Sequence, residues 1–267
     1  MALHRLTRTQ VMGIVNITPD SFSDGGDFYD PEMAIAHAKQ LVAEGADWLD
    51  IGAESTRPGA EPTSVDEELR RLLPVLSEIV KLGVPVSVDT RRVEVMREAL
   101  NFPIAMINDV SALHDAGAMA LCAKTGIAVC LMHMQGTPQT MQVNPHYEAI
   151  ASQVFGFLLE RAAACERAGI APNNIVLDPG FGFGKTLAHS QALMHALPTL
   201  CAAPYPVLVG WSRKRVLGEI TGHTTPKDRL AASLAVALRC VEKGAKILRV
   251  HDVRATVDAL NVWDAFK

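Results

Sequence analysis

The chain has 267 residues, a formal net charge of −4 and a hydrophobic fraction of 49%, enough to bury the core of one large domain. There is no basic surplus to favour a nucleic acid or an anionic membrane as partner. There is also no run of about 18 uncharged apolar residues that would span a bilayer.

The first ten residues contain no apolar signal-peptide core, and the five cysteines are widely spaced and odd in number. Such cysteines are typical of reduced, mostly buried thiols. We therefore expect a cytoplasmic protein without membrane attachment.

Eight short apolar runs follow one another along the chain, and each is followed by a polar loop and a helical pattern. The runs predict strands at 10–16, 47–55, 84–90, 105–111, 128–133, 175–180, 207–212 and 247–253. The patterns between and after them predict helices at 31–46, 64–83, 92–101, 115–126, 146–169, 187–200, 226–245 and 253–266. Several of these helices end in glycine, which accepts the left-handed conformation of a helix stop.

Continuous apolar strands separated by helices imply a parallel sheet covered on both faces. Eight such units favour a single α/β domain over residues 1–267, a closed (β/α)8 TIM barrel. An open doubly wound sheet is the alternative, because a count of elements does not prove closure.

Polar or ionisable groups follow every predicted strand. In a TIM barrel the loops after the carboxyl ends of the strands build the active site. We therefore expect one functional rim that contains Asn16, residues 50–57, Asp89, Asn108, Asp109, His133, Asp178, residues 212–215, Arg249 and His251.

Eight stretches of the chain, in order, resemble the dihydropteroate synthases of folate biosynthesis. They are MGIVNITPDSFSDGG, LDIGAESTRPGA, SVDT, INDVS, LMHMQG, LDPGFGFGK, GWSRK and RVHDV, spread over residues 12–253. The resemblance implies an enzyme that joins 6-hydroxymethyl-7,8-dihydropterin diphosphate to p-aminobenzoate. It also implies Mg²⁺ as cofactor, a homodimer formed through the late helices, and inhibition by sulfonamides.

The pterin ring has an edge of N–H donors, to which a carboxylate can accept two parallel hydrogen bonds. By resemblance Asp178 takes this edge, Asn108 the mixed neighbouring edge, Asp89 the reduced ring and Lys214 the carbonyl side. Taken alone, Asp178 and Asp89 could instead be helix N-caps. The resemblance adds Met132, Phe183 and Gly210 to the pterin pocket.

The leaving diphosphate requires positive charge. Arg249 and His251 are two apart on a predicted strand, so they point to the same side near the rim region where such barrels often bind phosphate. Asn16 offers a neutral oxygen ligand for Mg²⁺. Arg57 is expected at the diphosphate or at the second substrate. Asp89, Lys214, Arg249 and His251 are the predicted catalytic residues.

The segment PDSFSDGG at 19–26 combines turn-forming residues with one aromatic side chain. We expect it to close over the diphosphate, with Phe22 covering the aminobenzoate ring. The resemblance adds Thr56, Arg57, Pro58, Lys214 and Arg215 to the p-aminobenzoate site. Where relatives often have a smaller apolar residue and Ser, this chain has Trp211 and Arg215.

Other functions fit less well. GFGFGK lacks the spacing of a phosphate-binding P-loop, and His133 has no partner at metal-ligand spacing, so it is expected to be a structural or pocket residue. A corrinoid methyltransferase with a similar barrel would not need the SFSDGG, SRK and RVH segments. A non-catalytic paralogue would not need to keep them.

Overall fold

The computed structural model describes residues 6–18, 30–56 and 59–266. Its strands are all parallel and form one sheet in the order β6-β5-β4-β3-β2-β1-β8-β7. The strands are β1 (Gln10–Asn16), β2 (Trp48–Gly52), β3 (Val86–Asp89), β4 (Met106–Asp109), β5 (Ala128–Met132), β6 (Ile175–Asp178), β7 (Leu208–Val209) and β8 (Ile247–Val250).

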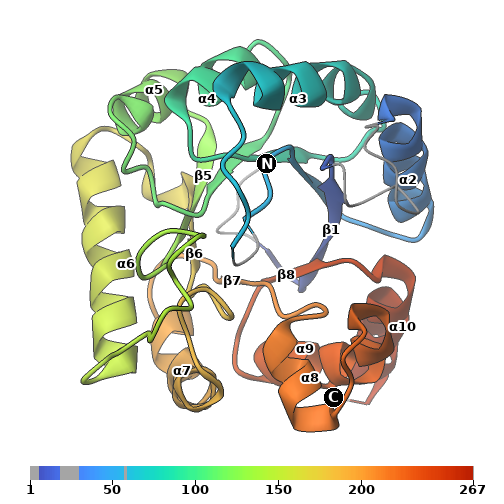
Figure 1. The fold of residues 1–267 in the computed structure, drawn as a ribbon, viewed down its shortest axis with the longest axis vertical. Coiled ribbons are helices and arrows are strands. Elements are labelled where there is room, and N and C mark those ends of the chain that lie inside the picture. Colours follow the sequence, from blue (N-terminus) through green and yellow to red (C-terminus); the bar gives the residue numbers. More distant parts are fainter. Residues whose placement is uncertain (1–5, 19–29, 57–58, 267) are drawn as a thin grey trace.

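The two ends of this sheet meet. An isolated parallel bridge joins Leu177 to Val207, and the backbone N–H of Leu177 donates to the carbonyl oxygen of Pro206 at 3.0 Å. The sheet therefore closes into a barrel, which Figure 1 shows nearly end-on inside a ring of helices. The predicted TIM barrel is confirmed, and the open sheet considered as its alternative was wrong.

The helices follow the strands in chain order and cover the outside of the barrel (Figure 1). They are α2 (Pro31–Ala43), α3 (Val65–Ile79), α4 (Val93–Ala99), α5 (Ala118–Thr125), α6 (Ile150–Arg167), α7 (Leu187–Cys201), α8 (Arg215–Thr221), α9 (Leu230–Glu242) and α10 (Val253–Ala265). Two short 3₁₀ helices, Pro172–Asn174 and Pro226–Arg229, precede β6 and α9.

Three helices differ from the prediction. Helix α9 begins at Leu230, not at Pro226, because residues Pro226–Arg229 form a 3₁₀ helix. Helix α8 was not expected, because its seven residues are too few to show helical periodicity. Helix α6 begins at Ile150, not at His146. The side chain of Gln135 donates to the carbonyl oxygen of His146 and accepts from its N–H, at 3.0 and 3.1 Å. These two bonds tie the His146 backbone to the loop after β5, outside the helix.

The buried apolar residues form two clusters. The larger cluster lies where the helices pack on the strands, and includes Leu41, Leu76, Val154 and Leu197. The smaller one fills the interior of the barrel with Met12, Trp48, Met106, Ala128, Cys130, Val176, Leu208 and Ile247.

Four residues of the predicted rim each come two positions after a residue of the interior cluster. Successive side chains of a strand point to opposite faces, so residues two apart share a face. Each of these polar groups therefore points into the barrel, one level above an apolar partner. The pairs are Trp48 and Asp50, Met106 and Asn108, Val176 and Asp178, and Ile247 and Arg249.

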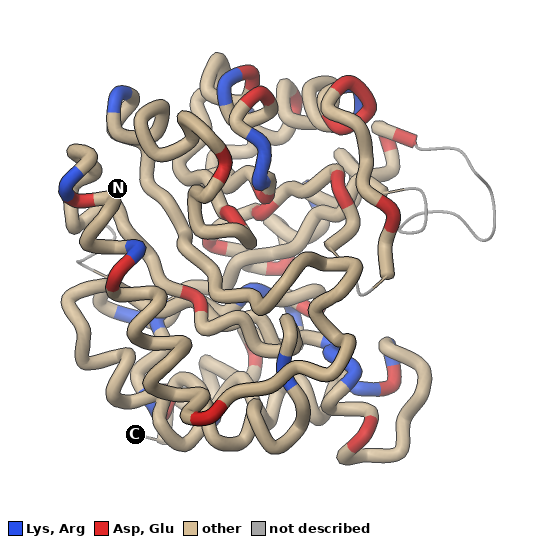
Figure 2. The backbone as a smooth tube through the Cα atoms, turned by 60° about the vertical axis from the view of Figure 1, so that its left-hand side comes forward, with Lys and Arg blue, Asp and Glu red and all other residues tan. Residues whose placement is uncertain are grey.

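The distribution of charged residues and the state of the cysteines agree with what the composition predicted. Figure 2 shows acidic and basic residues interspersed along the described chain. All five cysteines are free, four of them buried and Cys201 half-buried. None of the helices in the described ranges combines the length and apolar character needed to cross a membrane.

Candidate active site

Arg249 lies between two carboxylates at the inner rim. Its Nε donates to Oδ2 of Asp50 at 2.6 Å, and its Nη2 donates to Oδ2 of Asp89 at 2.8 Å. Burial alone would lower the pKa of Arg249, but the charges of Asp50 and Asp89 raise it, so the guanidinium stays charged. The predicted Arg249 and Asp89 are thus brought together. Asp50 was expected on the rim as part of residues 50–57, but without a specific role.

Burial also raises the pKa of Asp89, and the nearby carboxylate of Asp50 adds to this, while Arg249 opposes both. Desolvation disfavours the charged form of a carboxyl group. Burial outweighs the ion pair with Arg249, so the pKa of Asp89 is raised to about 7.

Asn108 lies beside the same group, at the end of β4. Its Nδ2 donates to Oδ2 of Asp50 at 3.2 Å, and only 5% of the residue is exposed. In the strand register Asn108 is opposite Asp89. The two residues that were assigned to neighbouring parts of the pterin are therefore neighbours at the rim.

Asp178 ends β6 and is 7% exposed. Its Oδ1 accepts the backbone N–H of Gly180 at 2.7 Å. Burial raises the pKa of Asp178 to about 6, although the Gly180 hydrogen bond and the charge of Lys214 oppose this shift. None of the described residues donates to Oδ2. The carboxylate is thus fixed on one side and available on the other.

The loop after β6 is fixed by Lys185, which is 2% exposed. Its ammonium group contacts Nδ1 and the carbonyl oxygen of His133 at 3.1 and 3.2 Å, and donates to the carbonyl oxygen of Phe183 at 2.9 Å. Burial and the Lys185 charge lower the pKa of His133 to about 3, so the ring is neutral and Nδ1 accepts. These contacts are consistent with the structural role that was one of the two expected for His133.

Lys214 precedes α8, and its Nζ lies 4.0 Å from the centre of the Phe183 ring. Burial and the charge of Arg249 lower its pKa to about 8. The preceding residue, Arg213, has a φ of 59°, which is unusual for a side chain with a Cβ. Hydrogen bonds to Asp252 and from the Arg213 N–H to Ser233 hold this conformation, and the conformation fixes the backbone from which Lys214 extends.

His251 follows β8, one residue beyond the strand that was expected to include it. Its backbone N–H donates to Oγ of Ser212 at 3.1 Å, and its Nδ1 lies 3.0 Å from the same oxygen. Burial and the charges of Arg213 and Arg249 lower its pKa to about 3. A neutral ring whose Nδ1 accepts the Ser212 hydroxyl has its proton on Nε2. In the ligand-free site, this tautomer of His251 offers an N–H donor and no positive charge.

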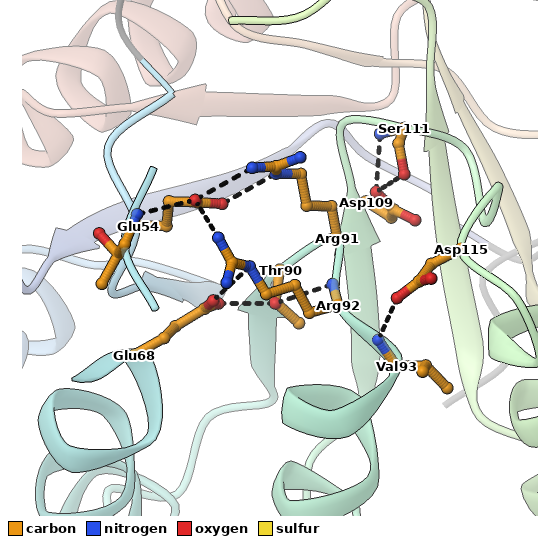
Figure 3. Close-up of polar contacts among 10 residues, drawn as sticks. Glu54, Glu68, Thr90, Arg91, Arg92, Val93, Asp109, Ser111 and Asp115 are labelled. Carbon is orange, nitrogen blue, oxygen red and sulfur yellow. Dashed lines mark hydrogen bonds and ion pairs between the residues drawn. The ribbon is translucent and has the colours of Figure 1, made fainter. Parts of the chain in front are cut away.

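A buried ion-pair network holds the start of the loop after β2 (Figure 3). Glu54 accepts from Nε of Arg91 at 2.9 Å and from Nη2 of Arg92 at 2.7 Å. Arg92 also lies 3.3 Å from Glu68, which accepts the hydroxyl of Thr90 at 2.6 Å. Burial would raise the pKa of Glu54, but the two arginines hold it below its ordinary value. The network ties this loop to the residues that follow Asp89.

Asn16 is half-buried at the carboxyl end of β1. An amide oxygen suits Mg²⁺, which keeps several waters and takes few protein ligands when it binds with phosphate oxygens. The described residues contain no group of three or more His, Cys, Asp or Glu side chains that could hold a metal ion by themselves. This donor set fits an ion held mainly by a phosphate substrate and water.

The remaining predicted residues lie as follows. Met132 is buried at the end of β5, and Gly210, Thr56 and Phe183 are half-buried in rim loops. Arg215 is exposed and pairs with Glu219 at 3.0 Å on α8. Trp211 is buried and stacks on Phe181, with ring centres 4.5 Å apart. The predictions for Phe22, Arg57 and Pro58 lie outside the described residues.

Three residues have structural roles that sequence reasoning did not assign: Asp50 and Glu54, which it placed on the rim without a specific role, and Lys185. Each is a charged side chain within an otherwise apolar or glycine-rich run, and each is nearly fully buried. Charged residues are almost never buried unless they are paired. A charged residue within such a run therefore indicates a buried, paired side chain, and this pattern could have identified all three residues.

Comparison with known proteins agrees with this geometry. The model of the pterin binding enzyme family matches residues 12–251. A dihydropteroate synthase of Neisseria meningitidis serogroup C is 54% identical over 264 residues, 97% of this chain and 93% of the relative. A structure of Xanthomonas albilineans dihydropteroate synthase with 4-aminobenzoic acid has a TM-score of 0.92 and 51% identity, and covers 98% of this chain and 94% of that chain. Another from the same organism, with 7,8-dihydropteroate, has a TM-score of 0.89, 48% identity and the same coverage.

The family model spans the barrel and its rim of buried carboxylates, an amide and cations, so the chain belongs to the pterin binding enzymes. Within the family it belongs to the dihydropteroate synthases. Its reaction is the condensation of 6-hydroxymethyl-7,8-dihydropterin diphosphate with p-aminobenzoate to 7,8-dihydropteroate and diphosphate. It is therefore a transferase.

Proposed function

We propose that the described rim residues perform this condensation in the roles that follow. Asp178 accepts two N–H groups of the pterin edge, because its buried carboxylate is anchored by Gly180 through one oxygen and open on the other. Asn108 takes the neighbouring edge, and Lys214 donates to the carbonyl side. The half-buried Phe183 ring, below the Lys214 ammonium group, forms a wall of the same pocket, together with Met132 and Gly210.

The departing diphosphate is held by Arg249 and His251. Nε and Nη2 of Arg249 are used by the two aspartates, whereas none of the described residues accepts a hydrogen bond from Nη1. Neutral His251 adds an Nε2–H donor. Hydrogen bonds from a charged donor to phosphate oxygens are the strong ones. The positive charge at this site therefore comes from Arg249, and His251 adds a hydrogen bond that orients the diphosphate.

Asn16 is the protein ligand of Mg²⁺ in this proposal, with Arg57 as a further contact to the diphosphate. When it is bound, the ion neutralises part of the charge on the diphosphate oxygens. Asn16 fits this role because a single neutral oxygen leaves room for waters and phosphate.

As the bond from the pterin methylene to diphosphate oxygen breaks, positive charge develops on the methylene and spreads into the reduced ring. Asp89 stabilises this charge, since its carboxylate lies beside Asn108 and pairs with Arg249. The aniline nitrogen of p-aminobenzoate then forms the new C–N bond and loses a proton. The reaction requires no nucleophile from the protein.

The second substrate is assigned to the loops after β1, β2 and β7. Phe22 covers its ring, and Thr56, Arg57, Pro58, Lys214 and Arg215 surround it. We further propose that the enzyme is cytoplasmic and forms a homodimer through its late helices. Both statements rest on the resemblance to the family.

The observation that carries the pterin assignment is the buried, half-satisfied carboxylate of Asp178. An Asp178→Asn variant would present an amide donor to ring donors, and an unpaired buried donor costs about 1–3 kcal/mol. Calorimetry should therefore show at least a tenfold loss of affinity for the pterin diphosphate, with the fold intact by circular dichroism. Unchanged affinity would remove Asp178 from pterin recognition.

A further inference from the structure

We propose that Asp50 is a positioning residue of the pterin pocket, which fixes the amide of Asn108 with its oxygen toward the substrate and holds the guanidinium of Arg249 side-on. The proposal rests on the pterin role assigned to Asn108 above. Asp50 is fully buried, so it acts through these two neighbours rather than by touching a ligand.

The register of the strands places Asp50 one level below Asn108. Asp50 is opposite Ser87, and Ser87 is opposite Met106, whereas Asn108 is opposite Asp89 at the rim. Asp50 therefore supports the rim residues from inside the barrel.

The chemistry of the contact fixes the orientation of the Asn108 amide. An ionised carboxylate only accepts hydrogen bonds, so the group that Asn108 directs at Asp50 is its NH₂. Nδ2 donates to Oδ2 of Asp50 at 3.2 Å. The amide oxygen is then directed away from Asp50, and none of the described residues donates to it. It is available as an acceptor for a pterin N–H.

The same carboxylate oxygen fixes Arg249. Nε of Arg249 donates to Oδ2 of Asp50 at 2.6 Å, while Nη2 donates to Asp89. A guanidinium is rigid and planar, so these two bonds set the plane of the group and leave Nη1 for the diphosphate. One buried oxygen thus orients a recognition group for each half of the substrate.

The other oxygen of Asp50, Oδ1, is buried and has no hydrogen-bond partner among the described residues. A buried acceptor without a partner is unfavourable for stability, and so is a buried charge. Retaining this carboxylate fits a role in positioning better than a role in stabilising the fold.

The test uses the free alcohol 6-hydroxymethyl-7,8-dihydropterin, because this ligand has no diphosphate and so isolates the Asn108 contact. We expect Asp50→Ala to raise its Kd about tenfold, the effect of one lost hydrogen bond. Asp50→Asn should stay within about threefold of the natural protein, because a carboxamide oxygen in place of Oδ2 still accepts from both neighbours.

A double-mutant cycle separates positioning from general disturbance. In an Asn108→Ala background, Asp50→Ala should add less than about twofold to the Kd, because its effect passes through Asn108. Ser87→Ala is the matched control, since Ser87 is opposite Asp50 in the register and its buried hydroxyl has no hydrogen-bond partner among the described residues. It should leave the Kd unchanged.

Three results would overturn the proposal: an unchanged Kd in Asp50→Ala, a tenfold loss that persists without Asn108, or an equal loss in Ser87→Ala. If Asp50→Ala does not fold, Asp50→Ser replaces it, because its oxygen is too close to the backbone to reach both neighbours. Asp178→Asn is measured in parallel. If that variant also binds the alcohol normally, the pterin site itself is wrongly assigned; otherwise only the role of Asp50 fails.

Discussion

Gly180 lies against the backbone of His133 so closely that a side chain at this position would place its Cβ 2.0 Å from the carbonyl oxygen of His133. The φ of Gly180 is +68°, a conformation that favours glycine. This contact allows the N–H of Gly180 to reach Asp178 and the ammonium group of Lys185 to reach His133.

We therefore expect Gly180→Ala to displace the loop after β6. The variant should lose at least tenfold in affinity for the pterin diphosphate and unfold at a lower temperature. Calorimetry and thermal denaturation provide the two measurements. Gly83→Ala is the control for a positive φ, because a Cβ at Gly83 meets no atom within 4 Å; an equal loss of pterin affinity in that variant would contradict the account.

Arg249→Ala should affect both binding and stability. It leaves Asp50 and Asp89 unpaired in a buried site, and breaking a buried ion pair costs about 3–5 kcal/mol. We expect a lower free energy of unfolding in denaturant titrations, together with weak binding of the diphosphate substrate.

His251→Ala separates the effect on binding from the effect on stability. Neutral His251 forms no ion pair with a carboxylate, so its removal leaves no buried charge unpaired. It should weaken the pterin diphosphate more than the pterin alcohol in calorimetry. Its free energy of unfolding should change much less than that of Arg249→Ala. Equal losses for both ligands would show that His251 only supports the fold.

The pKa values of Asp178 and Lys214 predict how pterin binding depends on pH. Burial raises the pKa of Asp178 to about 6, so its accepting carboxylate is lost as the pH falls below 6. Burial and Arg249 lower the pKa of Lys214 to about 8, so its positive charge is lost above pH 8. Affinity measured from pH 5 to 9 should pass through a maximum near neutrality.

The acidic side of this profile should be weaker in Asp178→Asn, and the part that remains belongs to Asp89, whose pKa burial raises to about 7. The stability of the ligand-free protein depends on Asp178 in the opposite direction: it is favoured by low pH, whereas pterin affinity is lost there. Because the raised pKa makes folded Asp178 bind a proton more readily than the unfolded chain, its contribution to stability is present below about pH 4 and is lost as the pH rises through 6. An acidic side that persists unchanged in the variant would assign it to another group.

Phe22→Ala tests the predicted loop closure over the second substrate. If the loop forms the p-aminobenzoate site only over bound diphosphate, the natural enzyme should bind p-aminobenzoate poorly without pterin and diphosphate, since a minor conformer lowers apparent affinity. The variant should show a raised KM for p-aminobenzoate, weaker sulfonamide inhibition and nearly normal pterin affinity. A normal KM would remove Phe22 from the site.

Much of this arrangement was predictable from the sequence because strand ends and helix stops have local signals. Asp178 ends an apolar run, so its place at the rim followed from the barrel. Asp50 received no role because its partner, Arg249, lies 199 residues away, and such a contact has no local pattern. Lys185 was considered only as part of a P-loop, and its burial depends on His133 from another strand.

The most direct test of the account is turnover by the purified protein with 6-hydroxymethyl-7,8-dihydropterin diphosphate, p-aminobenzoate and Mg²⁺. We predict formation of 7,8-dihydropteroate and an equal amount of diphosphate, both lost in Asp178→Asn. If the folded natural protein binds the pterin diphosphate but forms no dihydropteroate, the account of its catalysis is contradicted.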